Sequence, residues 1–294
     1  MIYLQKVIAL VEKESCIDSL KMLGQTLLGD GVGFRCFLGE DVMNCRLVID
    51  CSPEAADEYR DDERRLWITD SAGQASNLTR QGEAVLALLH VDNREQDFSG
   101  ILYACESPEE LDAEYMDRVY RRCADIPWDI IETDRCMVRE TTEADVEAFF
   151  EIYAHSEISH YTEGLYPTVE KEKEYIREYI EKVYGFLGFG VWSILKKDTG
   201  EIIGRAGFSY REGYEEPEIG FVIGVPWQGQ GYAWEVCSAL LTMGEKNFGF
   251  TIVNAFVRPE NKASVALCKK LGFKELTTVR KGGEKHLYMQ RYKG

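Results

Sequence analysis

The chain has 294 residues, of which 45% are apolar, and a net charge of -17. This length is typical of one or two folded domains, and the acidity argues against a nucleic-acid partner. No stretch approaches the roughly 20 apolar residues of a membrane span, and the N-terminus has no basic region followed by an apolar run, so we expect a cytoplasmic protein without a membrane partner.

The charge is unevenly distributed along the chain. Residues 1–134 contain 28 acidic and 13 basic residues, whereas residues 135–294 contain 23 and 21. A near-neutral half tolerates an anionic ligand better than a strongly acidic one. The composition therefore predicts two domains, an acidic one at 1–134 and a second at 135–294.

The first domain shows apolar runs of strand length that alternate with helix signals. This alternation predicts a parallel, Rossmann-like α/β layer. The helix expected after Ser107 has Pro108 and two carboxylates in its first turn, which suits the positive end of a helix. We expect strands at 65–70, 84–91 and 100–105, and helices at 71–81 and 107–122.

Asp70 ends one of these strands, and in this respect the first domain loosely resembles the last part of haloacid-dehalogenase-like phosphatases. Such phosphatases carry a nucleophilic Asp-x-Asp early in the chain, and this sequence contains none. Asp50 is the nearest acid at the end of an earlier strand-like run. We expect a structural or docking role for residues 1–134, with phosphatase activity as the alternative.

Cysteine and histidine spacing does not suggest a metal site. The nine cysteines form no Cys-x-x-Cys pair, and the chain has only four histidines. His155 and His160 have no acidic or cysteine partner at metal spacing. We therefore expect reduced thiols and no metal cofactor.

The most informative segment of the second domain is 217–235, which predicts an apolar strand, a glycine-bearing turn and the start of a helix. The first N–H groups of a helix lack intrahelical partners, and preceding glycines let the backbone curl around an anion. The Lys-Ser/Thr of a nucleotide-triphosphate loop is absent, as are the three spaced glycines of a dinucleotide site. The segment is therefore predicted to cradle a different phosphate.

Gln228-x-x-Gly231-x-Ala233 resembles the Gln/Arg-x-x-Gly-x-Gly/Ala loop of the GNAT acetyltransferases. The strand-like run Glu218-Ile219-Gly220-Phe221, the segment from Arg258 through Asn261 to Phe273, and the beginning at 138–145 also resemble that family in the expected order. The resemblance covers about 135–292 and is nearest to the ribosomal-protein N-acetyltransferase branch. It implies a GNAT fold, with a mixed, splayed central sheet flanked by helices.

The resemblance implies acetyl-CoA as co-substrate, with its pyrophosphate on the backbone of the glycine loop. Asn261 is also a good helix N-cap, and Ser264 lies three residues later on the same helix face. The implied cofactor-binding residues are Phe221, Val222, Ile223, Gln228, Gly229, Gln230, Gly231, Tyr232, Ala233, Asn261 and Ser264.

Acetyl transfer to an amine needs a base, a group that stabilises the oxyanion and an acid for the leaving thiolate. Glu218 is our candidate base, acting through water; the alternatives are binding of the substrate ammonium or simple packing. The backbone of 221–223 is the expected oxyanion donor. Many family members have tyrosine where this chain has Cys268, so the acid stays open between Ser264, Tyr288, Cys268 and unaided departure.

Residues 155–166 are expected to line the acceptor side. Tyr161, Glu163 and Tyr166 combine ring faces with a carboxylate, which suits a cationic amine. An ordinary surface loop is the alternative. Residues 170–184 alternate charges as a solvated helix face does, and no chemistry is expected there.

The predicted function is acetyl-CoA-dependent N-acetylation, by direct transfer to a primary amine of a small molecule or a protein N-terminus. The alternative is an acyl-CoA-binding sensor or scaffold without turnover. The sequence leaves open a homodimer and the identity of the amine.

Overall fold

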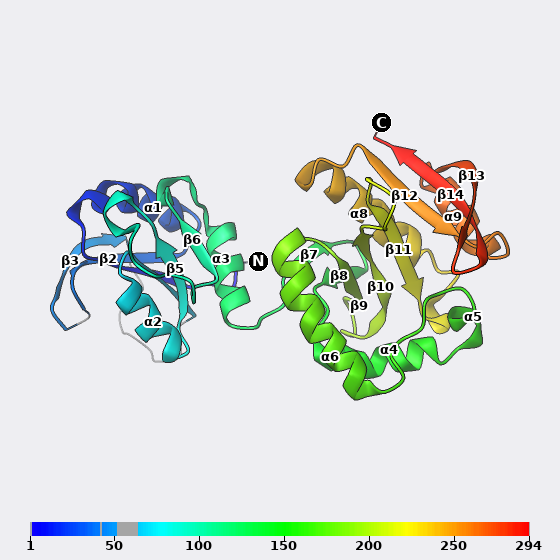
Figure 1. Cartoon of the computed structure of the whole chain (residues 1–294), viewed down its shortest axis with the longest axis horizontal. Helices are drawn as coiled ribbons and strands as arrows, with labels where there is room; N and C mark the ends of the chain where they lie inside the picture. The colour runs from blue at the N-terminus through cyan, green and yellow to red at the C-terminus, as the bar shows by residue number, and fades with distance from the viewer. Residues whose placement is uncertain (1, 42, 52–63, 294) are drawn as a thin grey trace. The chain divides into compact units, whose positions relative to one another are not determined.

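The computed structural model describes residues 2–41, 43–51 and 64–293. The chain forms two compact units, Met1–Trp128 and Asp129–Gly294 (Figure 1). None of the helices within the described ranges has the length and apolar character needed to span a bilayer.

The first unit is a sheet of the order β3-β2-β1-β4-β5-β6. All neighbouring strands are parallel except β2 and β3, which are antiparallel. The predicted parallel α/β layer is therefore confirmed. Its strands are β1 (Lys6–Val11), β2 (Gly33–Gly39), β3 (Cys45–Cys51), β4 (Arg65–Thr69), β5 (Ala84–Leu88) and β6 (Tyr103–Cys105).

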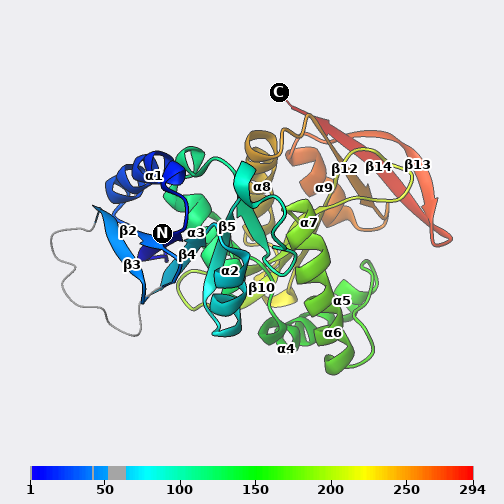
Figure 2. The same cartoon turned by 60° about the vertical axis from the view of Figure 1, so that its left-hand side comes forward.

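Helices cover both faces of this sheet (Figure 2). Helices α1 (Ile17–Gly29) and α3 (Ala113–Cys123) pack into one apolar core, and α2 (Ala72–Arg80) packs against residues of the opposite face. Burial on both faces explains why β1 and β5 are continuous apolar runs rather than alternating ones.

The helix expected from Ser107 begins later than predicted. Pro108–Glu110 forms a separate 3₁₀ turn, and Leu111 then adopts an extended conformation with ψ 151°. The side chain of Asp112 accepts a hydrogen bond from the Tyr115 N–H at 2.8 Å and caps α3. The N-cap of this helix is therefore Asp112 and not Ser107, because only the Asp112 side chain accepts a hydrogen bond from an N–H of the first turn.

The second unit is a sheet of the order β13-β14-β12-β11-β10-β9-β8-β7. Strand β7 begins at Asp129 and pairs with β8, so residues 129–134 lie in this unit rather than before it. The strands are β7 (Asp129–Glu132), β8 (Cys136–Arg139), β9 (Val191–Lys196), β10 (Ile202–Ser209), β11 (Glu218–Ile223), β12 (Ile252–Val257), β13 (Lys274–Lys281) and β14 (Glu284–Tyr292).

Helices also cover both faces of the second sheet. Helix α8 packs its apolar side chains into the core with Phe208 and Ile219, whereas α4 and α6 lie on the other face (Figure 1). The helices are α4 (Val146–Tyr153), α5 (Ser156–Ser159), α6 (Val169–Tyr179), α7 (Gly185–Leu187), α8 (Tyr232–Asn247) and α9 (Lys262–Lys270).

The parallel junction of β11 and β12 interrupts an otherwise antiparallel sheet. In the described register these strands pair at Glu218 and Asn254, the first residue of β11 and the third of β12. Beyond this point the ladder stops, so the two strands diverge. The splayed sheet predicted from the sequence is confirmed.

Candidate active site

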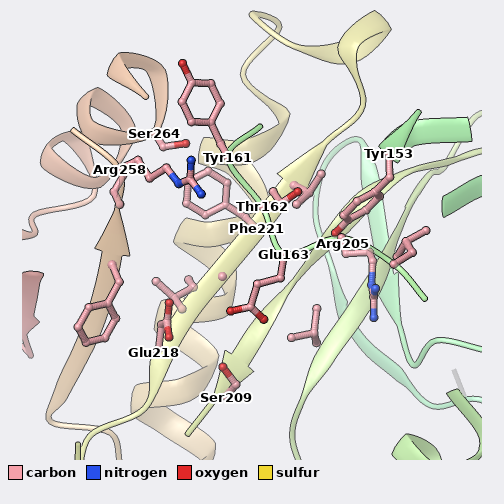
Figure 3. A pocket seen from close by; sticks show the side chains of 18 of the residues that line it. Tyr153, Tyr161, Thr162, Glu163, Arg205, Ser209, Glu218, Phe221, Arg258 and Ser264 are labelled. Carbon is pink, nitrogen blue, oxygen red and sulfur yellow. The ribbon is translucent and has the colours of Figure 1, made fainter. Parts of the chain in front are cut away.

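A cavity of about 870 Å³, seen from close by in Figure 3, includes residues of α4 and α6 in its lining. Strands β10, β11 and β12, helix α9 and the segment 161–167 all contribute to its lining. It brings together several of the residues predicted from the sequence: Tyr161, Glu163, Tyr166, Glu218, Phe221, Val222, Asn261 and Ser264.

The register of β10 and β11 builds the floor of this cavity. Ser209 lies opposite Glu218, Gly207 opposite Gly220, and Arg205 opposite Val222. A Cβ atom built on Gly220 would meet no atom within 4 Å. The middle of the floor is therefore open because it carries no side chain.

Glu218 lies at one end of the floor and is only 9% exposed. Arg211 Nε donates to its Oε2 at 2.6 Å, and the Arg211 guanidinium stacks over the Phe256 ring at 4.6 Å. The ion pair and the ring fix the orientation of the carboxylate. The sequence gives no signal for Arg211, because the loop before β11 has no regular pattern.

Phe221 and Val222 line the cavity, whereas Ile223 is buried in the core with 7% exposure. Since the described β11–β12 pairing stops at Glu218, the edge of β11 that faces β12 is not covered by a regular ladder beyond that residue. Backbone polar groups on this edge are therefore the ones that can bind a ligand.

The glycine loop follows β11 and leads into α8. Gly229 and Gly231 adopt left-handed φ angles of 72° and 87°, and Gly231 is the N-cap of α8. This geometry explains the two glycines and leaves the first N–H groups of a long helix without a side-chain cap. Among the described residues, 228–233 do not belong to the lining of the cavity itself.

The Gln228 side chain makes a hydrogen bond within the loop. Its Nε2 donates to the Ile223 carbonyl at 2.8 Å and closes the turn. The Gln230 Nε2 likewise donates to the Pro226 carbonyl at 2.9 Å. The side chains of both glutamines therefore stabilise the loop.

Arg135, which lies near the start of the second unit in sequence, holds this loop in place. Its Nη1 donates to the Gln230 carbonyl at 3.1 Å, its Nε to Glu235 Oε2 at 2.7 Å, and its guanidinium lies 4.2 Å from the centre of the Tyr232 ring. These contacts span about a hundred residues of sequence. The sequence gives no signal for this role of Arg135, because no local pattern predicts such a contact.

Helix α9 places three polar or sulfur-bearing residues in the lining. Asn261 Oδ1 accepts a hydrogen bond from the Ser264 N–H at 3.0 Å, so Asn261 is an N-cap as well as a cavity residue. Burial raises the pKa of the Cys268 thiol to about 12. Cys268 therefore remains a neutral thiol at ordinary pH and is a poor proton donor.

Tyr288 lies outside the residues that line the cavity. Its ring stacks on Phe256 with centroids 5.0 Å apart, its hydroxyl donates to Asn254 Oδ1 at 3.2 Å, and Gln290 Nε2 donates to that hydroxyl at 2.6 Å. Burial raises the pKa of Tyr288. Of the acid candidates, the structure brings Ser264 and Cys268 into the cavity and leaves Tyr288 beside it.

The acceptor end contains residues that the sequence analysis missed. Tyr153 on α4, Glu172 and Tyr175 on α6, and Arg205 on β10 join the predicted segment in the lining. Glu172 was expected on a solvated helix face, yet it is only 2% exposed and its Oε2 accepts from the Tyr166 N–H at 2.8 Å. The alternating charges of α6 predict a solvated helix and give no sign that the position of Glu172 is buried.

The first unit holds a polar cluster at the ends of its parallel strands. It consists of Cys16, Asp70 and His90. Each has one atom that could bind a metal, and these three atoms lie within 4.8 Å of one another. Asp70 accepts from the N–H groups of Glu12 at 2.8 Å and Lys13 at 3.1 Å, and His90 Nε2 is 3.3 Å from its Oδ2. These residue types can bind a metal, but here the carboxylate fastens the end of β1 to the end of β4.

Residues 135–274 match the acetyltransferase (GNAT) domain. The chain is 32% identical over 159 residues to an uncharacterized N-acetyltransferase, YoaA, of Bacillus subtilis (strain 168), covering 51% of this chain and 86% of that protein. It is 27% identical over 164 residues to the ribosomal protein uS5-alanine N-acetyltransferase of Escherichia coli (strain K12), covering 52% and 81%.

A solved structure of a GnaT-family acetyltransferase from Bordetella pertussis aligns with a TM-score of 0.49 at 24% identity. The alignment covers 56% of this chain and 99% of that one.

Proposed function

Because this chain belongs to the GNAT acetyltransferase family and is an acetyl-CoA-dependent N-acetyltransferase, we propose that it transfers acetyl directly to a primary amine bound in the cavity. The acceptor is an amine of a small molecule or a protein N-terminus. The observation that carries this proposal is that a single cavity joins the open edge of β11, the N-terminus of α9 and an acceptor wall rich in tyrosine and carboxylate.

The residues around the glycine loop fit a coenzyme A pyrophosphate. Gly231 is in a left-handed conformation at the start of α8, and a Cβ atom there would approach Arg135 Nη2 to 3.5 Å. The free N–H groups of the first turn supply hydrogen bonds and a partial positive charge to an anion. The pantetheine arm then follows the uncovered edge of β11 toward Asn261 and Ser264.

Glu218 is the proposed base. An alkylamine, with a pKa of about 10, is almost fully charged at neutral pH and has to lose a proton before it attacks. The Glu218 carboxylate, held by Arg211, faces the cavity and takes up this proton through a water molecule. Backbone N–H groups of 221–223 stabilise the oxyanion that forms when the amine attacks the thioester.

Ser264 is proposed to donate a hydrogen bond to the departing thiolate, which takes its proton from solvent. It lies in the lining on α9, whereas Tyr288 lies outside the lining. Glu218 then releases the proton of the amine to solvent, and the enzyme returns to its starting state.

The proposal is tested by incubating the full chain with acetyl-CoA and a panel of amines. Release of the coenzyme A thiol and a mass gain of the amine are measured together. We expect acetylated product with some of these amines and a loss of rate in Glu218→Gln. Tight binding of acetyl-CoA in a calorimetric titration, with no product from any amine or peptide, would favour the sensor alternative.

A further inference from the structure

Arg205 is a cavity cation that pairs with no carboxylate among the described residues at salt-bridge distance. The two other arginines of the lining differ, since Arg211 pairs with Glu218 and Arg258 lies 4.0 Å from Glu284. The Nε of Arg205 is buried and, within the described part of the chain, finds no hydrogen-bond partner. A partly buried guanidinium without an anion is costly, so its position needs an explanation.

An aromatic ring and a tyrosine hydroxyl, rather than a paired carboxylate, hold Arg205 in place. Its guanidinium lies over the Phe149 ring at 4.5 Å, and Tyr153 stands beside it (Figure 3). Burial raises the pKa of the Tyr153 hydroxyl, against the opposing effect of the Arg205 charge. The hydroxyl therefore stays protonated and is a neutral donor next to the cation. Two groups that suit an anion thus face the same space.

The register places this anion-binding end opposite the proposed base. Arg205 is paired with Val222 and Ser209 with Glu218, so four residues of strand separate the two ends, which is about 13 Å along the backbone. Gly220 lies in the floor between them. Figure 3 shows Glu218 and Arg205 on opposite sides of Glu163. The floor therefore has a carboxylate at one end and a guanidinium at the other.

We propose that the acceptor is a small amino acid, a primary amine whose own carboxylate binds Arg205 while the amine points toward Glu218. This inference rests on the proposed function and names its substrate class. A fork-shaped guanidinium matches a carboxylate with two hydrogen bonds. Glu163 and Glu172 in the same wall attract the ammonium as it enters.

The charges of the wall discriminate against other acceptors. A polyamine would place a second ammonium against Arg205, which repels it. A phosphate ester would bring a second negative charge toward Glu163 and Glu172. A protein N-terminus would present a neutral amide where the carboxylate is needed, and the guanidinium would stay without an anion. A single negative charge a few bonds from the amine fits best.

The test compares amino acids with their own primary amides. The probes are the α-amino acids and the series from β-alanine to 6-aminohexanoate, each with its carboxamide, and kcat and KM are measured with saturating acetyl-CoA. We expect the best acid to exceed its amide at least about tenfold in kcat/KM, the factor typical of a charge-assisted hydrogen bond. Amides that react as well as the acids would overturn the inference while leaving the proposed function intact.

Two variants and a control locate the preference at Arg205. Arg205→Met is expected to bring the acid-to-amide ratio to about one with an unchanged KM for acetyl-CoA, while Arg205→Lys keeps part of the ratio. The exposed Arg177, paired with Glu143 on the surface, supplies the control Arg177→Met, which should preserve it. A ratio that survives in Arg205→Met would contradict the assignment.

A binding measurement covers the case in which no amine is acetylated. The same acids are titrated by calorimetry into the complex of the full chain with coenzyme A. Binding to the wild type that disappears in Arg205→Met supports the carboxylate site even if the proposed reaction fails. Absence of binding by every acid would overturn the site.

Discussion

Asn254 lies opposite Glu218 at the point where β11 and β12 meet. Its Nδ2 donates to the Glu216 carbonyl at 2.9 Å, and its Oδ1 accepts from the Tyr288 hydroxyl at 3.2 Å and from Gln290 Nε2 at 3.0 Å. One fully buried amide thus connects β12 to β14 and to the residues that lead into β11. Asn254 therefore holds β11 and β12 together at the point from which they diverge, and this fixes the position of Glu218.

Replacing Asn254 by alanine should destabilise the protein strongly. The change removes three hydrogen bonds at a site with 0% exposure and leaves partly buried partners unsatisfied, so we expect a loss of about 2–4 kcal/mol in the free energy of unfolding. Tyr288→Phe removes one of these bonds and should cost about 1 kcal/mol. Urea unfolding of the full chain measures both; equal effects would argue against a central role for Asn254.

Glu218→Gln should lower kcat by about 10²–10⁴, the range for a lost general base, with little change in KM for acetyl-CoA. The amide keeps the size of the side chain but cannot take up a proton. Glu215 is exposed and lies three residues away, so Glu215→Gln is the matched control and should retain full rate. Steady-state kinetics at several pH values would show whether the loss belongs to Glu218; an active Glu218→Gln enzyme would rule it out as the base.

Gly231→Trp should abolish acetyl-CoA binding. Gly231 has a φ of 87°, and an indole on it would fill the space in front of the first turn of α8. Gly200→Trp is the control for the effect of backbone strain alone. Gly200 has a φ of 71°, and no atom lies within 4 Å of its Cβ position. Calorimetric titration of acetyl-CoA into both variants measures this. Unchanged affinity in Gly231→Trp would show that the pyrophosphate binds elsewhere.

Cys268→Ala should leave kcat within about threefold, whereas Ser264→Ala should lower it at least about tenfold. Burial raises the pKa of Cys268 to about 12, so the thiolate fraction is negligible below pH 10 and grows only as the pH approaches that value. Iodoacetamide at pH 8 should accordingly modify Cys268 far more slowly than an exposed thiol, as peptide mass spectrometry would show. The reverse ranking of the two variants would make Cys268, rather than Ser264, the group that acts on the thiolate.

The locally encoded parts of the fold were predictable from the sequence. The strand, glycine turn and helix of 217–235 became β11, the loop with left-handed Gly229 and Gly231, and α8, because glycine conformation and apolar periodicity are properties of neighbouring residues. Errors arose where two local signals competed, as at Ser107 and Asp112. There the hydrogen bond actually formed selected the helix start.

The acceptor wall was predictable only in part. Tyr161, Glu163 and Tyr166 came from one segment, but Arg205, Tyr153 and Glu172 sit in a strand and two helices whose patterns look ordinary. Glu172 is the clearest case, since its neighbours in sequence are charged and solvated while its own carboxylate is enclosed. Burial of a single helix position depends on what packs against it.

The sequence by itself determined the two-part organisation, the parallel layer of the first unit and the loop that marks the second as an acetyltransferase, because each is written in contiguous residues. Tertiary structure alone decided which side chains share the cavity. Arg205 faces the same space as Glu218 only through the register of β10 with β11, and that register is set by hydrogen bonds between strands and by the packing of α4 and α6 on their face.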